Sequence, residues 1–236
     1  MGRKKKAVKP LETIWEVSDE LWAKIEPILL EDAPPPPTVK GGRKRTDWRQ
    51  AFNGIIFRMR TGCQWNQLPK QFGDDSSVHR WFQRWNRNGV MEKVWAALVS
   101  ECDELGGVSW QWQSADGAMG KARFGGDKVG PNPTDRGKSG VKRSVIVEQD
   151  GGPLGAVIAG ANVHDTKLLA GTIEAIVVER PEPTEEHPQN LCLDKGYDNP
   201  TGRESAAAKG HTPHIRRIGE EKAVQRGKKS TSRGDG

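Results

Sequence analysis

Two acidic residues, Asp116 and Asp194, are the positions in this sequence best suited to chemistry. Asp194 directly follows the apolar run Leu191, Cys192 and Leu193, and Asp116 lies in the strand-like segment QWQSADGA. A carboxylate on a buried strand is costly unless a partner or a ligated ion compensates its charge. If the fold brings the two strands together, the carboxylates repel each other unless a cation lies between them. Mg²⁺ or Mn²⁺ prefers such oxygen ligands, and a carboxylate site of this kind activates water or a 3′-hydroxyl for attack on a phosphodiester.

Glycines near both aspartates leave a second interpretation open, in which each acid is a turn residue at the end of a strand. His164 and Asp165, in ANVHD, pose a similar choice just before a predicted helix. We expect Asp165 to be the N-cap of that helix, because aspartate accepts hydrogen bonds from the free amides there. His164 either approaches the metal site or a phosphate, or is an ordinary loop residue.

Positive charge is clustered along the chain, whose formal net charge is +6. Basic runs open the chain, span 40–49 and lie near the end, which indicates a polyanionic partner and nucleic acid above all. Solvated surface is the alternative explanation, and an anionic membrane fits less well because no amphipathic basic helix accompanies the runs. The run at 40–49 supplies three candidate DNA contacts, Arg43, Lys44 and Arg45.

A further basic segment, GPNPTDRGKSGVKRS at 130–144, is rich in glycine and proline. We interpret it as a mobile loop beside the carboxylates that grips a DNA backbone, because phosphate contacts dominate the affinity of proteins for DNA. An ordinary solvated loop explains the segment equally well. Its candidate contact residues are Arg136, Lys138, Lys142 and Arg143.

The 3 cysteines have neither metal-ligand spacing nor a paired framework, so we expect them to be reduced and packed in the interior. No apolar run approaches the length of a membrane span, and the N-terminus has no apolar signal core. These features predict a soluble, cytoplasmic protein without a membrane partner.

The first half of the chain has helical periodicity, and all 9 tryptophans lie at or before Trp112. This shift in composition predicts two unlike domains. Ser18 is the expected N-cap of a helix over 19–30, and the APPPP run at 33–37 ends that helix. A second helix over 47–62 is expected to bury one apolar face, made of Trp48, Phe52, Ile55, Ile56 and Met59.

The segment 66–86 has the pattern of a helix-turn-helix, with a short helix at 66–72, a turn at 73–75 and a second helix over 76–86. A further helix is expected over 90–104. Polar and cationic residues on an exposed face of the second helix suit contacts with base edges and phosphates. These residues are His79, Arg80, Gln83, Arg84 and Arg87.

The second half of the chain changes to the periodicity of strands. Strands are expected over 110–119, 141–151, 152–165, 190–194 and 212–218, with helices over 166–178 and 200–210. Three strands of antiparallel character, followed by helix, strand, helix and strand, is the order of a mixed α/β sheet.

Taken together, these segments resemble a bacterial insertion-sequence transposase of the DDE type. The resemblance covers nearly the whole chain. The N-terminal half, from LWAKIEPILL to SSVHRWFQRWNRNGVMEKVW, is similar to the DNA-binding region of that family. Four further segments resemble, in order, parts of its catalytic domain: SADGAMGKA, the stretch from GPNPTDRGKSG to NVHDTKLL, LDKGYDN and HIRRIGEEK.

The resemblance implies a helical, helix-turn-helix-like N-terminal domain followed by an RNase H-like mixed sheet with flanking helices. It makes Asp116 and Asp194 the first two catalytic aspartates and ligands of magnesium. It also implies DNA as the partner, both transposon ends and target, and a homo-oligomer as the active form. The implied reaction is hydrolysis at the transposon ends, followed by attack of the freed 3′-hydroxyl on target DNA.

The third acid of the family, a glutamate on a later helix with basic neighbours, is not found in this sequence. Glu220 and Glu221 match an earlier segment of the family pattern, and the polar, basic sequence past Lys222 lacks apolar periodicity. We therefore expect a chain truncated before the third acid, with an incomplete catalytic domain and little or no activity. Two alternatives follow: a DNA-binding remnant that competes with an intact transposase, or a protein completed by frameshifting or a second product.

The predicted organisation has four parts. They are a basic disordered tail at 1–17, a helical DNA-binding domain at 18–108, the incomplete RNase H-like domain at 109–219 and a second basic disordered tail at 220–236.

Overall fold

The computed structural model describes residues 16–34 and 46–216. Several predictions fall outside this part of the chain, namely those on Arg43, Lys44, Arg45, Glu220 and Glu221, and on the C-terminal tail. Val17, the last residue of the predicted N-terminal tail, is buried, and its amide donates a hydrogen bond of 3.0 Å to Asn53 Oδ1. The predicted tail was therefore wrong at its last residue.

Two compact units make up the chain, and the division falls between Ala97 and Leu98, inside helix α4 (Val90–Glu104). The sequence predicted a boundary between 108 and 109, after that helix. Because the helix runs through the division without a break, composition alone gives no signal at this point.

The first unit is helical. Ser18 caps α1, as predicted, by accepting a hydrogen bond of 3.3 Å from the Leu21 amide. The predicted short helix at 66–72 is instead two separate 3₁₀ turns, because Pro69 cannot continue a helix and forces Leu68 into an extended conformation. The elements are α1 (Asp19–Glu31), α2 (Trp48–Thr61), η1 (Trp65–Gln67), η2 (Lys70–Phe72), α3 (Asp75–Arg87) and the start of α4.

The core of the first unit is aromatic. Trp85 of α3 is fully buried, and the Trp48 ring lies edge-on to Trp85 and to Trp81, with centroid distances of 6.3 and 5.2 Å. Met59, which was predicted on the buried face of α2, is 61% exposed. The prediction was wrong there because the buried residues of this helix end at Ile55.

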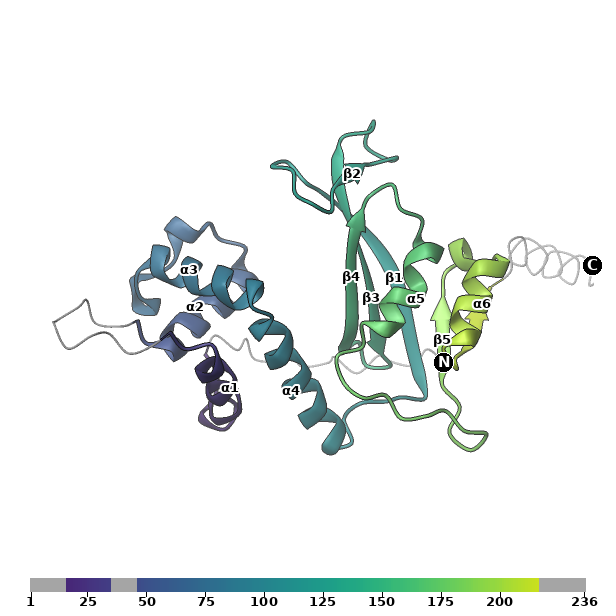
Figure 1. The fold of residues 1–236 in the computed structure, drawn as a ribbon, viewed down its shortest axis with the longest axis horizontal. Helices are drawn as coiled ribbons and strands as arrows, with labels where there is room; N and C mark the ends of the chain where they lie inside the picture. The colour runs from purple at the N-terminus through teal and green to yellow at the C-terminus, as the bar shows by residue number, and fades with distance from the viewer. Residues whose placement is uncertain (1–15, 35–45, 217–236) are drawn as a thin grey trace, which may run out of the picture. The chain divides into compact units, whose positions relative to one another are not determined.

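The second unit is a mixed sheet with two helices (Figure 1). Its strands lie in the order β4-β3-β1-β5-β6, where β4, β3 and β1 are antiparallel and β1, β5 and β6 are parallel. A short β2 pairs with the start of β3. This is the predicted RNase H-like arrangement. The bounds are β1 (Trp112–Lys121), β2 (Gly130–Pro131), β3 (Ser139–Glu148), β4 (Pro153–Gly160), α5 (Asp165–Glu174), β5 (Asn190–Leu193), η3 (Lys195–Tyr197), α6 (Pro200–Ala208) and β6 (Thr212–Ile215).

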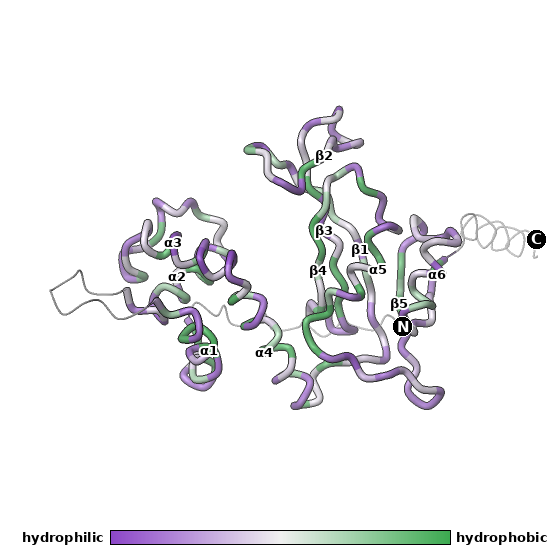
Figure 2. Tube along the Cα trace, in the orientation of Figure 1, coloured by the Kyte–Doolittle hydropathy of each residue, from purple (hydrophilic) through white to green (hydrophobic). Residues whose placement is uncertain are grey.

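Helices α5 and α6 cover one face of the sheet, and apolar residues concentrate along its strands (Figures 1 and 2). Ala115, Ile146 and Leu191 point towards these helices and are buried. Trp112 and Ile158 belong to the opposite face and are 37% and 49% exposed. We refer to this opposite face as the open face of the sheet.

The cysteines did not meet the prediction of interior packing. All three are free, and Cys102 and Cys192 are exposed, while Cys63 is half-buried. Cys192 alternates with the buried Leu191 and Leu193 along β5, so it faces the open side of the sheet.

Candidate active site

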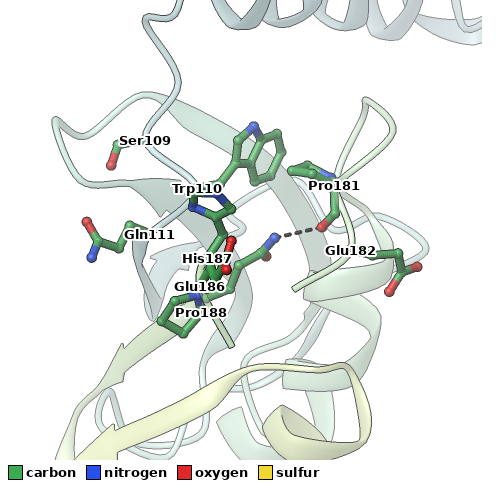
Figure 3. A pocket seen from close by; sticks show the side chains of 9 residues that line it. Ser109, Trp110, Gln111, Pro181, Glu182, Glu186, His187 and Pro188 are labelled. Carbon is green, nitrogen blue, oxygen red and sulfur yellow. Dashed lines mark hydrogen bonds between the residues drawn. The ribbon is translucent and has the colours of Figure 1, made fainter. Parts of the chain in front are cut away.

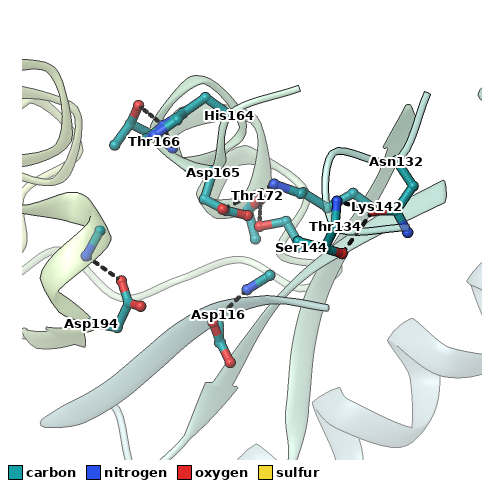
Figure 4. A network of polar contacts seen from close by, with 12 residues as sticks. Asp116, Asn132, Thr134, Lys142, Ser144, His164, Asp165, Thr166, Thr172 and Asp194 are labelled. Atoms are coloured by element: carbon teal, nitrogen blue, oxygen red, sulfur yellow. Dashed lines mark hydrogen bonds and ion pairs between the residues drawn. The ribbon is translucent and has the colours of Figure 1, made fainter. Parts of the chain in front are cut away.

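Strand register brings the two predicted aspartates together. The parallel pairing of β1 with β5 places Ser114 beside Cys192. If this register is extended by two residues along each strand, Asp116 of β1 comes level with Asp194, which directly follows β5. Side chains alternate along a strand, so the Asp116 carboxylate lies on the open face, and Figure 4 shows it pointing away from α5. Asp194 lies beyond the end of β5, and its side chain turns to the backbone of η3.

Each aspartate is exposed, and one of its oxygens is held by a nearby backbone amide. Asp116 Oδ1 accepts a hydrogen bond of 2.7 Å from Gly117 N, and Asp194 Oδ1 accepts one of 2.8 Å from Gly196 N. Asp116 lies in the middle of β1 and not at its end, so the interpretation of Asp116 as a turn residue is excluded. Asp194 lies one residue beyond the end of β5 and caps η3, so its interpretation as a turn residue at the end of a strand remains open.

The donor set of this pair suits a hard divalent cation. Mg²⁺ is commonly held by one or two carboxylates, with waters and substrate phosphates completing its coordination. Within residues 16–34 and 46–216, no group of three or more His, Cys, Asp or Glu side chains could hold a metal ion. The described part of the chain therefore offers two carboxylate ligands here and no third acid.

A buried polar layer lies behind Asp116, on the side of the sheet that α5 covers (Figure 4). Lys142 Nζ is 2.9 Å from Asp165 Oδ2, and the lysine side chain is only 7% exposed. The sequence predicted that Asp165 is the N-cap of α5, and this prediction was wrong. His164 is the cap, and its Nδ1 accepts from the Thr166 amide at 3.4 Å, so its side chain is turned towards Thr166 (Figure 4).

Tyr197 completes this layer from the side of Asp194. Burial raises the pKa of its hydroxyl, and the carboxylates of Asp165, Asp116 and Asp194, in that order, raise it further. The nearby Ser144 hydroxyl lowers the pKa of Tyr197 and so offsets part of this rise. That hydroxyl accepts a hydrogen bond from Thr172. Tyr197 Oη itself is buried without a hydrogen-bond partner among the described residues. The phenol is therefore neutral, beside three carboxylates.

Two family models match the chain. Residues 109–234 match "Transposase DDE domain", and residues 17–95 match "Putative transposase of IS4/5 family (DUF4096)". The chain belongs to the DDE transposases of the IS4/5 family. The first model covers the unit that carries Asp116 and Asp194, and the second covers the tryptophan-rich helices.

Curated relatives come from the same class of mobile element. The chain is 38% identical over 96 residues to the "Putative transposase for insertion sequence element IS402" of Burkholderia cepacia, a match that covers 39% of this chain and 45% of the relative. It is 31% identical over 123 residues to the "Insertion element IS402 uncharacterized 16.2 kDa protein" of the same organism, covering 50% of this chain and 80% of that protein. The chain thus spans less than half of the length of the first relative. No solved structure matches the chain significantly.

Helix α3 of the transposase presents an exposed polar stripe. Asp74 caps the helix, and Ser76, Arg80, Gln83 and Arg87 are exposed at helical spacing along it. We refer to Arg80, Gln83 and Arg87 as the α3 stripe. Its residues were among those that the sequence singled out on this helix.

The other two candidates on α3 are engaged within the first unit. Arg84 Nε lies 2.7 Å from Asp32 Oδ2, and this guanidinium lowers the pKa of the Asp32 carboxyl. The His79 ring stacks on Trp65 with a centroid distance of 4.6 Å and an interplanar angle of 16°. Both side chains tie elements together, which a charge pattern along one helix does not reveal.

The predicted basic loop at 130–144 is partly strand, because β3 begins at Ser139. Lys142 is buried against Asp165, so the structure contradicts its prediction as a DNA contact. Arg136, Lys138 and Arg143 are exposed. Arg143 pairs with Ala118, two residues along β1 from Asp116, and therefore projects from the same open face.

A pocket of about 430 Å³ lies beside the segments that lead into β1 and β5 (Figure 3). Trp110 and Gln111, just before β1, line it together with the segment from Pro181 to Gln189, just before β5. Gln189 Nε2 donates to the Pro181 carbonyl at 2.7 Å and holds this segment in place. None of the predicted site residues lies in this pocket.

No helix in the described ranges is long and apolar enough to cross a membrane.

Proposed function

We propose that this transposase cleaves DNA at the ends of its insertion sequence and joins the freed ends to target DNA, with Asp116 and Asp194 as ligands of catalytic Mg²⁺ or Mn²⁺. The observation that supports the proposal is the parallel pairing of β1 with β5, whose register, extended two residues beyond Ser114 and Cys192, brings Asp116 level with Asp194. When bound, the ion would supply an activated water or 3′-hydroxyl and stabilise charge on the phosphodiester. The two carboxylates would hold the ion, and the hydrogen bonds that they accept from Gly117 N and Gly196 N orient them.

DNA recognition is assigned to two surfaces. The α3 stripe (Arg80, Gln83 and Arg87) would bind the terminal inverted repeats, since an exposed polar helix face suits the major groove. Arg143, Arg136 and Lys138 would contact the DNA backbone near the aspartates. Arg43, Lys44 and Arg45 remain candidates for the same role. Action as a homo-oligomer on paired ends, in the cytoplasm, belongs to the same proposal.

A second candidate function is DNA binding without catalysis, as a competitor of an intact transposase. It is favoured by the absence of any three-acid cluster from the described residues. If the protein is catalytic instead, its third acid comes from residues outside the described ranges or from a second product.

A cleavage assay separates these two functions. Labelled DNA that carries the ends of the element is incubated with the full chain and Mg²⁺ or Mn²⁺, and nicking is compared for the wild type, Asp116→Ala and Asp194→Ala. Asp150→Ala, in the exposed turn between β3 and β4, is the matched control. Nicking that both site variants abolish and the control retains supports the transposase reaction. Specific binding without nicking supports the competitor, and nicking that survives both substitutions rejects the site.

A further inference from the structure

We propose that the ion pair of Lys142 with Asp165 positions Asp116 for metal binding, acting through the backbone of Gly117. The inference rests on the function proposed above, in which Asp116 holds the metal. It assigns a positioning role to two residues that do not reach the open face themselves.

The Asp165 carboxylate is fixed on one side by a buried cation. Its Oδ2 lies 2.9 Å from Lys142 Nζ, and the lysine side chain is 7% exposed. Removing one partner of a buried ion pair leaves an uncompensated charge, so the two side chains hold each other in place. Asp165 also begins α5, and the ion pair thereby anchors the N-terminal end of this helix to β3.

The other oxygen of Asp165 packs on the backbone of Gly117. Asp165 Oδ1 is buried and has no hydrogen-bond partner among the described residues. A Cβ atom on residue 117 would lie 2.0 Å from this oxygen, so the carboxylate occupies the space that any side chain would need. The absence of a side chain at Gly117 is therefore what lets Asp165 approach β1 here.

Gly117 in turn holds Asp116. Its amide donates the hydrogen bond of 2.7 Å to Asp116 Oδ1, on the opposite face of the sheet from Asp165. A shift of the Gly117 peptide therefore turns the Asp116 carboxylate. The chain of contacts runs from Lys142 through Asp165 and Gly117 to Asp116, across the thickness of one strand.

Asp165 does not serve as a third acid of the site. It lies on the face of the sheet that α5 covers, whereas the Asp116 carboxylate points away from α5 (Figure 4). Its charge is already compensated by Lys142. A ligand of the metal would need its lone pairs on the side of Asp116.

The first test needs no metal. Amide hydrogen exchange at Gly117 is measured by NMR on the full chain, for the wild type and Asp165→Asn. We expect exchange at Gly117 to accelerate about tenfold, as for the loss of one constrained hydrogen bond. Lys209→Met is the matched control, since Lys209 pairs with Glu174 at the other end of α5 and does not touch Gly117. Unchanged exchange at Gly117 in Asp165→Asn overturns the proposal.

A double variant guards against loss of the fold. Lys142→Met with Asp165→Asn removes both charges and leaves no unpaired buried ion, a change that proteins tolerate better than removal of one partner. Exchange at Gly117 should remain fast in this double variant. Exchange that returns to the wild-type rate would show that charge balance alone matters and would contradict positioning.

The second test measures Mn²⁺ affinity by calorimetry on the same proteins. Removing a group that orients a metal ligand costs about 10- to 100-fold in affinity, and we expect a loss of that order in Asp165→Asn and none in Lys209→Met. If the wild type binds no Mn²⁺, the proposed metal site fails while the exchange result still decides the role of the ion pair. Wild-type affinity in Asp165→Asn overturns the positioning role.

Discussion

A methyl group on residue 117 would stand 2.0 Å from Asp165 Oδ1, whereas one on residue 120 of the same strand would meet only Val141 Cγ2, at 3.8 Å. The first distance is a clash, and the second is an ordinary contact. Gly117 is thus required by the approach of α5 to β1, and Gly120 is not.

We predict that Gly117→Ala lowers the free energy of unfolding by about 1–3 kcal/mol, because the added carbon overpacks a buried contact. Gly120→Ala should change it by less than about 0.5 kcal/mol. Urea denaturation of the full chain measures both. Equal effects of the two substitutions would show that Asp165 yields freely at this point.

At the scale of single residues, the sequence revealed candidate ligands but not their neighbours. Asp116 and Asp194 stood out because each is a carboxylate on a strand-like run. Lys142 and Arg84 look like any other cation in the sequence, yet each pairs with an aspartate distant in the chain. The N-terminal position of Asp165 on its helix favoured a capping role, and only the fold shows that Lys142 holds it instead.

At the scale of elements, helix α3 carries two arginines, one turn apart, that have different environments. Arg80 is exposed, while Arg84 is bound to Asp32 at the end of α1. The first is available to a DNA partner, and the second stabilises the first unit.

We predict that Arg80→Gln weakens binding to a labelled duplex of the terminal repeat and reduces the slope of log affinity against log salt by about 1. Arg84→Gln should leave that slope unchanged and lower the melting temperature instead. Fluorescence anisotropy at several salt concentrations gives the slope, and thermal unfolding gives the stability. A salt slope that falls equally in both variants would refute this division of roles.

A buried histidine lies beside the parallel strands of the second unit. His211, just before β6, is 3% exposed, and its Nε2 lies 3.1 Å from Gln113 Oε1 of β1. Burial, and then the nearby Arg180, lower the pKa of His211 to about 4. The imidazole is therefore neutral in the folded protein, and the unfolded chain takes up its proton at a higher pH.

We predict that stability falls as pH drops from about 6.5 towards 4, by up to about 3 kcal/mol from this residue. The contribution is fully present above the pKa of unfolded histidine, near 6.5. Urea unfolding at several pH values should show a weaker decline in His211→Gln than in the wild type. His214→Gln, at an exposed position of β6, should retain the wild-type decline. An identical decline in His211→Gln would contradict the assignment.

Element types were predictable from the sequence where periodicity was strong, and their limits were less so. Ser18 marked the start of α1, and the strand and helix order of the second unit followed from changes in period. Pro69 should have warned against a continuous helix at 66–72. Strand β2, with two residues, carries too little pattern to be seen.

For the whole molecule, the order of elements predicted the RNase H-like sheet, since three antiparallel strands followed by two crossover units leave few topologies. Register could not be predicted, because a shift of one residue leaves the order unchanged and moves every side chain to the other face. The meeting of Asp116 with Asp194 depends on that register. The predicted boundary between 108 and 109 coincides with the start of the match to the DDE domain model, whereas the compact units divide earlier, inside α4.

The measurement that tests this account most directly is a titration of the full chain with Mn²⁺, followed by electron paramagnetic resonance, for the wild type, Asp116→Asn and Asp194→Asn. Asp150→Asn serves as the control, because Asp150 lies in an exposed turn away from the pair. We predict specific Mn²⁺ binding that both site variants lose and the control retains. Binding that persists unchanged in Asp116→Asn and Asp194→Asn would contradict a metal site between these two carboxylates.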